Sequence, residues 1–191
     1  MLLDCLGQAC PMPVIRAKNA LKEIGADGVV SVLADNIECA ENIEKMAKAA
    51  GYPCVIEKSG ENYMITITKG LGETAPVTSK DNINNAVVVI SSLCMGSGSV
   101  EFGAALLKTF IYTLTESEVL PKGLIFYNEG VKLSCEGSSV SDINRLLEMG
   151  VDVLSCGACL EYYGLTIKAG RISNMFEITE MMMGASCVIK P

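Results

Sequence analysis

Apolar and polar positions follow two rhythms along the first 69 residues, and these rhythms predict strands and helices in turn. Short apolar or alternating runs predict strands, and runs with apolar side chains at every third or fourth position predict helices. Gly25 and Gly51 are expected to end the two helices, because glycine suits a helix C-terminus. The predicted elements are a strand at 1–5, a helix at 11–25, a strand at 29–35, a helix at 39–51 and a hairpin at 53–69. This β-α-β-α-β-β order predicts a two-layer sandwich, with two helices on one face of a four-stranded sheet.

The rhythm stops at residues 70–84, which are polar and rich in Gly, Pro, Thr, Ser and Asn, and predict a linker. A second domain is expected over residues 85–191, where continuous apolar runs alternate with helical patterns. Strands buried on both faces have such runs, so this part predicts a doubly wound, mostly parallel α/β domain. Its strands are expected at 86–92, 123–128, 151–155 and 186–190, and its helices at 104–116, 138–150 and 173–185.

Length and charge narrow the classes of protein. A chain of 191 residues suits two small domains, and half of its residues are hydrophobic, which is enough for two cores. No apolar run reaches the roughly 18 residues of a membrane span, and the N-terminus lacks the basic stretch of a signal peptide, so a soluble, cytoplasmic protein is expected. The net charge is −7, and both predicted domains are acidic, which disfavours nucleic-acid binding.

The chain has no histidine and nine cysteines. Without histidine there can be no Ser-His-Asp triad, no Cys-His pair and no histidine-bound metal. An odd number of cysteines fits a full disulfide framework poorly, and a cytoplasmic compartment keeps thiols reduced. The cysteines are therefore core residues, metal ligands or reactive groups, and a core role is the default for each one taken singly.

Cys10 stands directly before two prolines, in the stretch "ACPMPV" that opens the first predicted helix. Proline is favoured in the first turn of a helix, so Pro11 and Pro13 place Cys10 at or near the N-cap. There the helix dipole and the first N–H groups favour an anion and lower a thiol pKa, and Arg16 would add positive potential. The alternative is a cap position that holds a cysteine of no chemical importance.

The "CPMP" motif, together with the β-α-β-α-β-β order of residues 1–69, resembles the TusA/SirA family of small sulfur carriers. The resemblance implies that Cys10 accepts sulfane sulfur as a persulfide and passes it on. It also implies that Pro11 and Pro13 shape the turn that presents this thiol. Cys5, at the end of the first strand, is expected to be structural.

A second candidate site is the pair Cys156 and Cys159, just beyond the carboxyl end of a buried strand, the edge at which open α/β sheets hold reactive groups. A Cys-x-x-Cys spacing suits a redox or sulfur-relay pair, or half of a metal site, and it also occurs in plain packing. No second pair follows, although Cys94 and Cys135 also lie after strands. The glycine-rich stretch from Cys94 to Gly103 does not match a nucleotide-binding loop, and Cys94 would instead face Cys156 across the site.

Residues 85–191 resemble a DsrE-like domain, a fold used in intracellular sulfur transfer. This resemblance implies a reactive cysteine after a central strand, where Cys156 fits best and Cys159 is second. A TusA-like domain joined to a DsrE-like domain is similar to the YedF family, described as sulfurtransferase-like and linked to selenium metabolism.

The combined expectation is a sulfurtransferase-like carrier of sulfur or selenium. Cys10 would be charged as a persulfide, Cys156 would accept the atom, and Cys159 would resolve the linkage as a disulfide. The partners expected are a cysteine desulfurase or persulfide protein as donor, a downstream acceptor protein, and further copies of the chain associated through the DsrE-like domain. Neither a cofactor nor a metal is expected.

Two alternatives remain open from the sequence. The second domain would be a non-catalytic docking and oligomerisation module if its cysteines are buried and inert. It would be a thiol-disulfide regulator if Cys156 and Cys159 cycle as a disulfide in equilibrium with cellular thiols.

Overall fold

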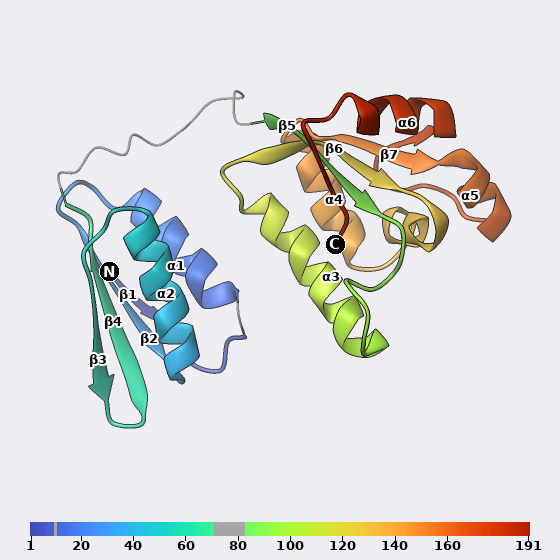
Figure 1. Ribbon diagram of the computed structural model, residues 1–191. Helices are drawn as coiled ribbons and strands as arrows, with labels where there is room; N and C mark the ends of the chain where they lie inside the picture. Colours follow the sequence, from blue (N-terminus) through green and yellow to red (C-terminus); the bar gives the residue numbers. More distant parts are fainter. Residues whose placement is uncertain (10, 71–82) are drawn as a thin grey trace. The chain divides into compact units, whose positions relative to one another are not determined.

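The computed structural model describes residues 1–9, 11–70 and 83–191 (Figure 1). The chain divides into two compact units, Met1–Pro76 and Val77–Pro191. Residues 71–82, which make up most of the predicted linker, and Cys10 lie outside the described residues. None of the described helices is long and apolar enough to span a membrane.

The first unit has the predicted β-α-β-α-β-β order. Its sheet, over the described residues, has the strand order β1-β2-β4-β3, with β1 parallel to β2 and the other neighbours antiparallel. Helices α1 and α2 lie side by side on one face of this sheet (Figure 1), which confirms the two-layer sandwich. The elements are β1 (Leu2–Asp4), α1 (Met12–Glu23), β2 (Val29–Ala34), α2 (Ile37–Ala49), β3 (Cys54–Ser59) and β4 (Asn62–Thr68).

The core of the first unit lies between the sheet and its helices. Alternate residues of β2 point inward, as a strand with one covered face requires. Small side chains on both helices, among them Ala17 and Ala40, let the helices approach the sheet closely. The remaining buried residues of this core are Leu3, Cys5, Ala20, Leu21, Val30, Val32, Ala34, Cys39, Ile43, Ala47, Ile65 and Ile67.

The second unit is a parallel α/β domain. In the part of the chain that the structure describes, its strand order is β8-β7-β6-β5-β9, and every neighbouring pair is parallel. This confirms the doubly wound, mostly parallel domain. The elements are β5 (Ile83–Ile90), α3 (Val100–Thr115), β6 (Leu120–Phe126), the 3₁₀ helix η2 (Asn128–Ser134), α4 (Ser139–Glu148), β7 (Asp152–Cys156), α5 (Gly157–Tyr163), β8 (Arg171–Ser173), α6 (Met175–Met183) and β9 (Cys187–Ile189).

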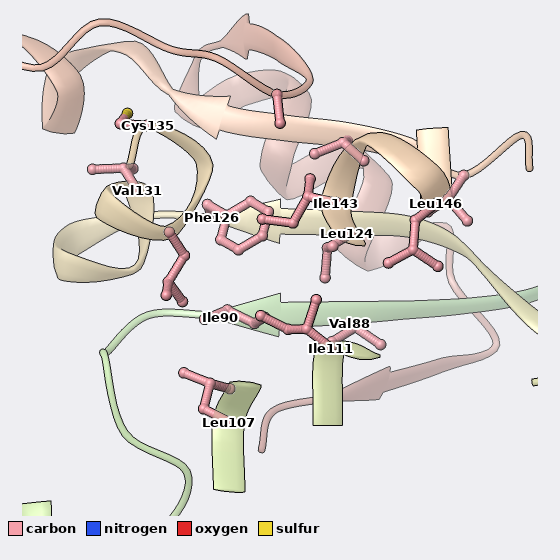
Figure 2. Packing of buried hydrophobic residues seen from close by; sticks show 14 of the residues in the cluster. Val88, Ile90, Leu107, Ile111, Leu124, Phe126, Val131, Cys135, Ile143 and Leu146 are labelled. Carbon is pink, nitrogen blue, oxygen red and sulfur yellow. The ribbon is translucent and has the colours of Figure 1, made fainter. Parts of the chain in front are cut away.

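Both faces of the second sheet are covered. Side chains of α3 and α4, such as Leu107 and Ile143, pack on one face against Val88, Leu124 and other strand residues (Figure 2). Ile178 of α6 packs on the opposite face, and Figure 1 shows α6 on the other side of the sheet from α3 and α4. Strands covered on both faces need apolar side chains at successive positions, which explains the continuous apolar runs of the sequence.

Some boundaries differ from the sequence-based expectation. Strand β5 begins at Ile83 rather than residue 86, because its first residues pair with β6 at Leu120. Helix α3 begins at Val100 rather than residue 104, because the Ser99 side chain accepts a hydrogen bond from the Phe102 N–H and caps the helix. The short elements β8 and η2 were not expected, since a strand of three residues and a 3₁₀ helix of seven leave no clear periodic signal.

The carboxyl ends of β5, β6 and β7 meet at one edge of the second sheet. The 3₁₀ helix η2 crosses this edge so closely that a Cβ on Gly130 would collide with the backbone carbonyl of Ile90. Close backbone approach of this kind requires glycine. The crossing brings the start of η2, at Asn128, beside the segment that follows β7.

Candidate functional site

The first predicted site lies at the start of α1. Pro11 is the N-cap and Pro13 the second helical residue, so the two prolines occupy the first turn as expected. Cys10 precedes Pro11 in the sequence and lies outside the described residues, so its activation stays a prediction. The Met12 N–H donates to the Ala9 carbonyl (3.1 Å), and proline has no N–H. Of the first three residues of α1, Met12 has its N–H already engaged and Pro13 has none, so neither can donate to a nearby anion.

The loop between β1 and α1 is fixed by hydrogen bonds to two carboxylates. The Leu6 N–H donates to Oδ1 of Asp4, and the Gly7 N–H donates to Oδ2 of Asp35, both at 3.0 Å. Gly7 has a φ of +70°, in the left-handed region that glycine adopts at little cost. The chain therefore approaches Cys10 along a path fixed by the ends of β1 and β2.

Arg16 lies over the end of β1. Its Nη1 donates to the Asp4 carbonyl at 2.6 Å and to the Cys5 sulfur at 3.6 Å. Cys5 is fully buried in the core of the first unit. Burial raises the pKa of the Cys5 thiol, although Arg16 acts to lower it. Cys5 therefore has the environment of a structural cysteine, and Arg16 links β1 to α1.

The second predicted site brings Cys156 and Cys159 together. Cys156 is the last residue of β7 and only 3% exposed, on the sheet face that α6 covers. Cys159 is one turn later in α5 and half-buried, and it packs against both cores of the second unit. The pKa of Cys159 lies above the ordinary thiol value, chiefly because of burial and also because of the Cys156 thiol, and the Asn128 N–H offsets only part of this increase.

Two residues that the sequence did not single out contribute to this site. The backbone N–H of Asn128 donates to the Cys159 sulfur at 3.1 Å. The Tyr163 hydroxyl donates to Oδ1 of the same asparagine at 3.0 Å. Asn128 has a positive φ of 51° and directly follows the strand and Tyr127. Asparagine tolerates this conformation, but the contact with Cys159 is made across 31 positions of sequence and has no local signature.

The other two cysteines of this edge have contacts of their own. The Cys94 thiol donates to the Val100 carbonyl at 3.3 Å, at the start of α3, and the Cys94 N–H donates to the Ser92 hydroxyl. Cys135 is buried at the end of η2, 3.8 Å from the Ser134 hydroxyl. Neither residue has a described contact with Cys156. Over residues 1–9, 11–70 and 83–191, no three Cys, Asp or Glu side chains gather as metal ligands would.

Residues 1–69 match the family described as Sulfurtransferase TusA. Over 68 residues the chain is 35% identical to a curated protein of Methanocaldococcus jannaschii named "Putative sulfur carrier protein", a match that covers 35% of this chain and 91% of that protein. It is similar to the crystal structure of a SirA-like protein from Desulfitobacterium hafniense, with 49% identity over 36% of this chain and 96% of that chain, at a TM-score of 0.35. It is also similar to the crystal structure of the ychN protein from E. coli, with 18% identity over 57% of this chain and 100% of that chain, at a TM-score of 0.41.

Proposed function

The chain belongs to the TusA family through residues 1–69, and from this membership we propose that it carries sulfane sulfur, or selenium, as a persulfide on Cys10. The observation that carries the proposal is the family match over a region in which the "CPMP" motif opens α1. A carrier of this kind needs an accessible thiol on a well-held loop rather than a deep pocket. The hydrogen bonds of Gly7 and Leu6 hold the chain that leads to Cys10.

The loading step is a thiol exchange that needs no cofactor. The Cys10 thiolate attacks the terminal sulfur of a donor persulfide and forms a new S–S bond. The S–S bond of the donor breaks, and its electron pair leaves on the cysteine sulfur of the donor as a thiolate. Nothing is oxidised or reduced overall. The donor would be a cysteine desulfurase or another persulfide protein, in a reducing compartment such as the cytoplasm.

The second unit would receive the sulfur from Cys10 through its cysteine pair, as a DsrE-like domain is expected to do. The half-buried Cys159, with an N–H donor at 3.1 Å, supports this relay. The burial of Cys156 supports the competing view that the second unit is a docking platform. A thiol-disulfide regulator is supported by the proximity of the two thiols.

Association of the chain with further copies would use the second unit, where exposed apolar side chains gather on α6 and at the start of α3. These are Met175, Phe176 and Met183 on α6, and Val100 and Phe102 on α3. Such an association would have to leave the thiols of the second unit accessible to a downstream acceptor protein. Light scattering of the purified chain measures the number of copies.

Mass spectrometry after incubation with a cysteine desulfurase and cysteine tests the carrier function. The wild type should gain about 32 Da, the mass of one persulfide sulfur, and Cys10→Ser should lose this adduct. Cys54→Ser is the matched control, since Cys54 is a half-buried cysteine of the same unit. An adduct on residues 1–69 that persists in Cys10→Ser, or an unmodified wild type, would refute the proposal. Selenium loading is recognised by the larger mass and the isotope pattern of the adduct.

A further inference from the structure

The two thiols of the second unit differ in their access to a partner. Cys156 is 3% exposed and belongs to the core beneath α6. Cys159 is half-buried and lies on α5 opposite the exposed start of η2. Thiol exchange requires that the attacking sulfur reach the sulfur of its partner. Access therefore favours Cys159, which reverses the order expected from the sequence.

The N–H that meets Cys159 is held in a defined direction. Asn128 has a φ of 51°, a conformation that most residues avoid and that asparagine tolerates. The first residue of η2 thereby turns its N–H toward α5, where it donates to the Cys159 sulfur at 3.1 Å. An N–H donor at this place stabilises a thiolate more than a thiol, because hydrogen bonds to an anion are stronger.

The side chain of Asn128 is tethered in turn. The Tyr163 hydroxyl donates to its Oδ1 at 3.0 Å, from the last residue of α5. The Tyr163 ring lies under the Nζ of Lys132, 4.7 Å from the ring centroid, and meets the Tyr162 ring edge-on at 5.0 Å. Cation–π and edge-to-face contacts of this kind restrain a ring. Asn128 is therefore held to α5 at two points, through its N–H to Cys159 and through its side chain to Tyr163.

Resting on the proposed function, we propose that Cys159 is the sulfur-accepting thiol of the second unit, that the Asn128 N–H holds its thiolate, and that Tyr163 is a positioning residue acting through Asn128. The nearby Cys156 then serves as the second thiol of the pair. Nothing in the family match over residues 1–69 bears on these residues.

The transfer balances without an added oxidant. The Cys159 thiolate attacks the terminal sulfur of a donor persulfide, and the donor cysteine leaves as a thiolate with the electron pair of the broken S–S bond. Cys159 now holds the persulfide. If Cys156 then attacks the Cys159 sulfur, hydrosulfide leaves and a Cys156–Cys159 disulfide remains. In that second step the sulfane sulfur is reduced and the two cysteines are oxidised.

The test is the rate of Cys159 alkylation by iodoacetamide, followed by peptide mass spectrometry between pH 6 and 10 in the full-length chain. Tyr163→Phe removes the tether and keeps the ring, and it should slow alkylation at pH 7.5 by about three- to tenfold and shift the profile to higher pH. Tyr162→Phe is the matched control and should leave the profile unchanged, since this neighbouring ring is 82% exposed and its hydroxyl makes no described hydrogen bond.

Two variants of Asn128 separate its backbone from its side chain. Asn128→Gly keeps an N–H in a residue that accepts a positive φ, whereas Asn128→Ala disfavours that backbone conformation. Asn128→Gly should therefore retain more of the wild-type rate than Asn128→Ala. Equal profiles for Tyr163→Phe and Tyr162→Phe, with the glycine and alanine variants no different from the wild type, would overturn the inference.

Loading the full-length chain with sulfur by a desulfurase, followed by peptide mass spectrometry, identifies which cysteine of the second unit accepts the sulfur. A sulfur adduct on the second unit that persists in Cys156→Ser and disappears in Cys159→Ser is expected, with the exposed Cys187→Ser as control. The reverse pattern would overturn the assignment of Cys159. Loss of all adducts in the second unit, while alkylation still follows the Tyr163 and Asn128 variants, would instead refute the relay and leave the thiolate assignment in place.

Discussion

The backbone N–H of Gly7 donates a 3.0 Å hydrogen bond to Oδ2 of Asp35, joining the β1–α1 loop to the residue after β2. The other oxygen of the same carboxylate accepts from the Asn36 side chain at 2.8 Å. Asn36 is also the N-cap of α2, where its Oδ1 accepts from the Cys39 N–H. The loop that leads to Cys10 is therefore connected to the start of the second helix through one carboxylate.

Replacing Asp35 tests this connection. Asp35→Ala removes the acceptor of the Gly7 N–H and should slow sulfur loading at Cys10 several-fold, with a loss of unfolding free energy of about 1–2 kcal/mol. Asp35→Asn keeps an oxygen acceptor and should retain most of both properties. Loading is followed by mass spectrometry and stability by urea denaturation. The control is Glu41→Ala, which removes an exposed carboxylate of α2, and an Asp35→Ala variant that behaves like it would contradict the prediction.

Replacing Arg16 tests the link between α1 and β1. Arg16→Ala leaves the Asp4 carbonyl without the 2.6 Å donor and should cost about 1–2 kcal/mol of unfolding free energy. Arg16→Lys should cost less, because its ammonium keeps the positive charge and an N–H donor for the Asp4 carbonyl. Urea denaturation measures both. If neither differs from Lys45→Ala, an exposed cation on α2, the link contributes nothing to stability.

Replacing Gly130 tests the crossing of η2 over the sheet edge. The Cβ of Gly130→Ala would meet the Ile90 carbonyl, so η2 must shift, at a cost of about 1–3 kcal/mol. The shift should also weaken the contact of Asn128 with Cys159. Hydrogen exchange of peptides from β5 and η2 should be faster, and Cys159 alkylation slower. Gly25→Ala, where an added Cβ meets open space, should leave both rates unchanged, and the same null result for Gly130→Ala would refute the crossing.

Alkaline pH should weaken the first unit. Burial raises the pKa of Cys5 and of Cys54 above the ordinary thiol value, so the folded state holds these protons more tightly than the unfolded state. The stabilisation is complete below the unfolded pKa of about 8.5 and is lost as the pH rises through the higher folded pKa. Hydrogen exchange of β1 and β2 peptides, corrected for the intrinsic rate, should therefore show falling protection above pH 8.5.

The control for this pH dependence is a variant without the titrating group. Cys5→Ala lowers stability at every pH, because it leaves a cavity, but it should flatten the decline above pH 8.5. Cys187→Ala removes an exposed thiol of the second unit and should not change the decline. An unchanged slope in Cys5→Ala would show that Cys5 does not titrate differently in the folded chain.

The elements with a strong periodic pattern were predicted well. The apolar spacing of α1 and the prolines at its start were enough to place it, since both are local properties of the chain. The continuous apolar run of β5 predicted a strand covered on both faces, which its burial confirms. By contrast, the strand β8 is three residues long and is defined by its pairing with β7, which no local pattern encodes.

In the candidate site too, the features with a local sequence pattern were predicted and those that depend on distant contacts were not. The sequence identified Cys156 and Cys159 through their spacing and their place after a strand. It also predicted that Cys94 would face Cys156, which stays a prediction; the Cys94 thiol donates to the Val100 carbonyl at the start of α3. Asn128 and Tyr163 were not predicted, because a backbone N–H that donates to a distant sulfur depends on how η2 crosses the sheet.

The sequence by itself determined the two α/β units, the position of the "CPMP" motif at the start of a helix, and the exclusion of histidine-based chemistry. These follow from periodicity, proline geometry and composition, which act locally along the chain. Only the tertiary structure decided that Cys156 is buried while Cys159 meets the Asn128 N–H, and that Asp35 holds the loop before Cys10. Burial and hydrogen-bond partners are set by segments far apart in sequence, so they exist only once the sheets have formed.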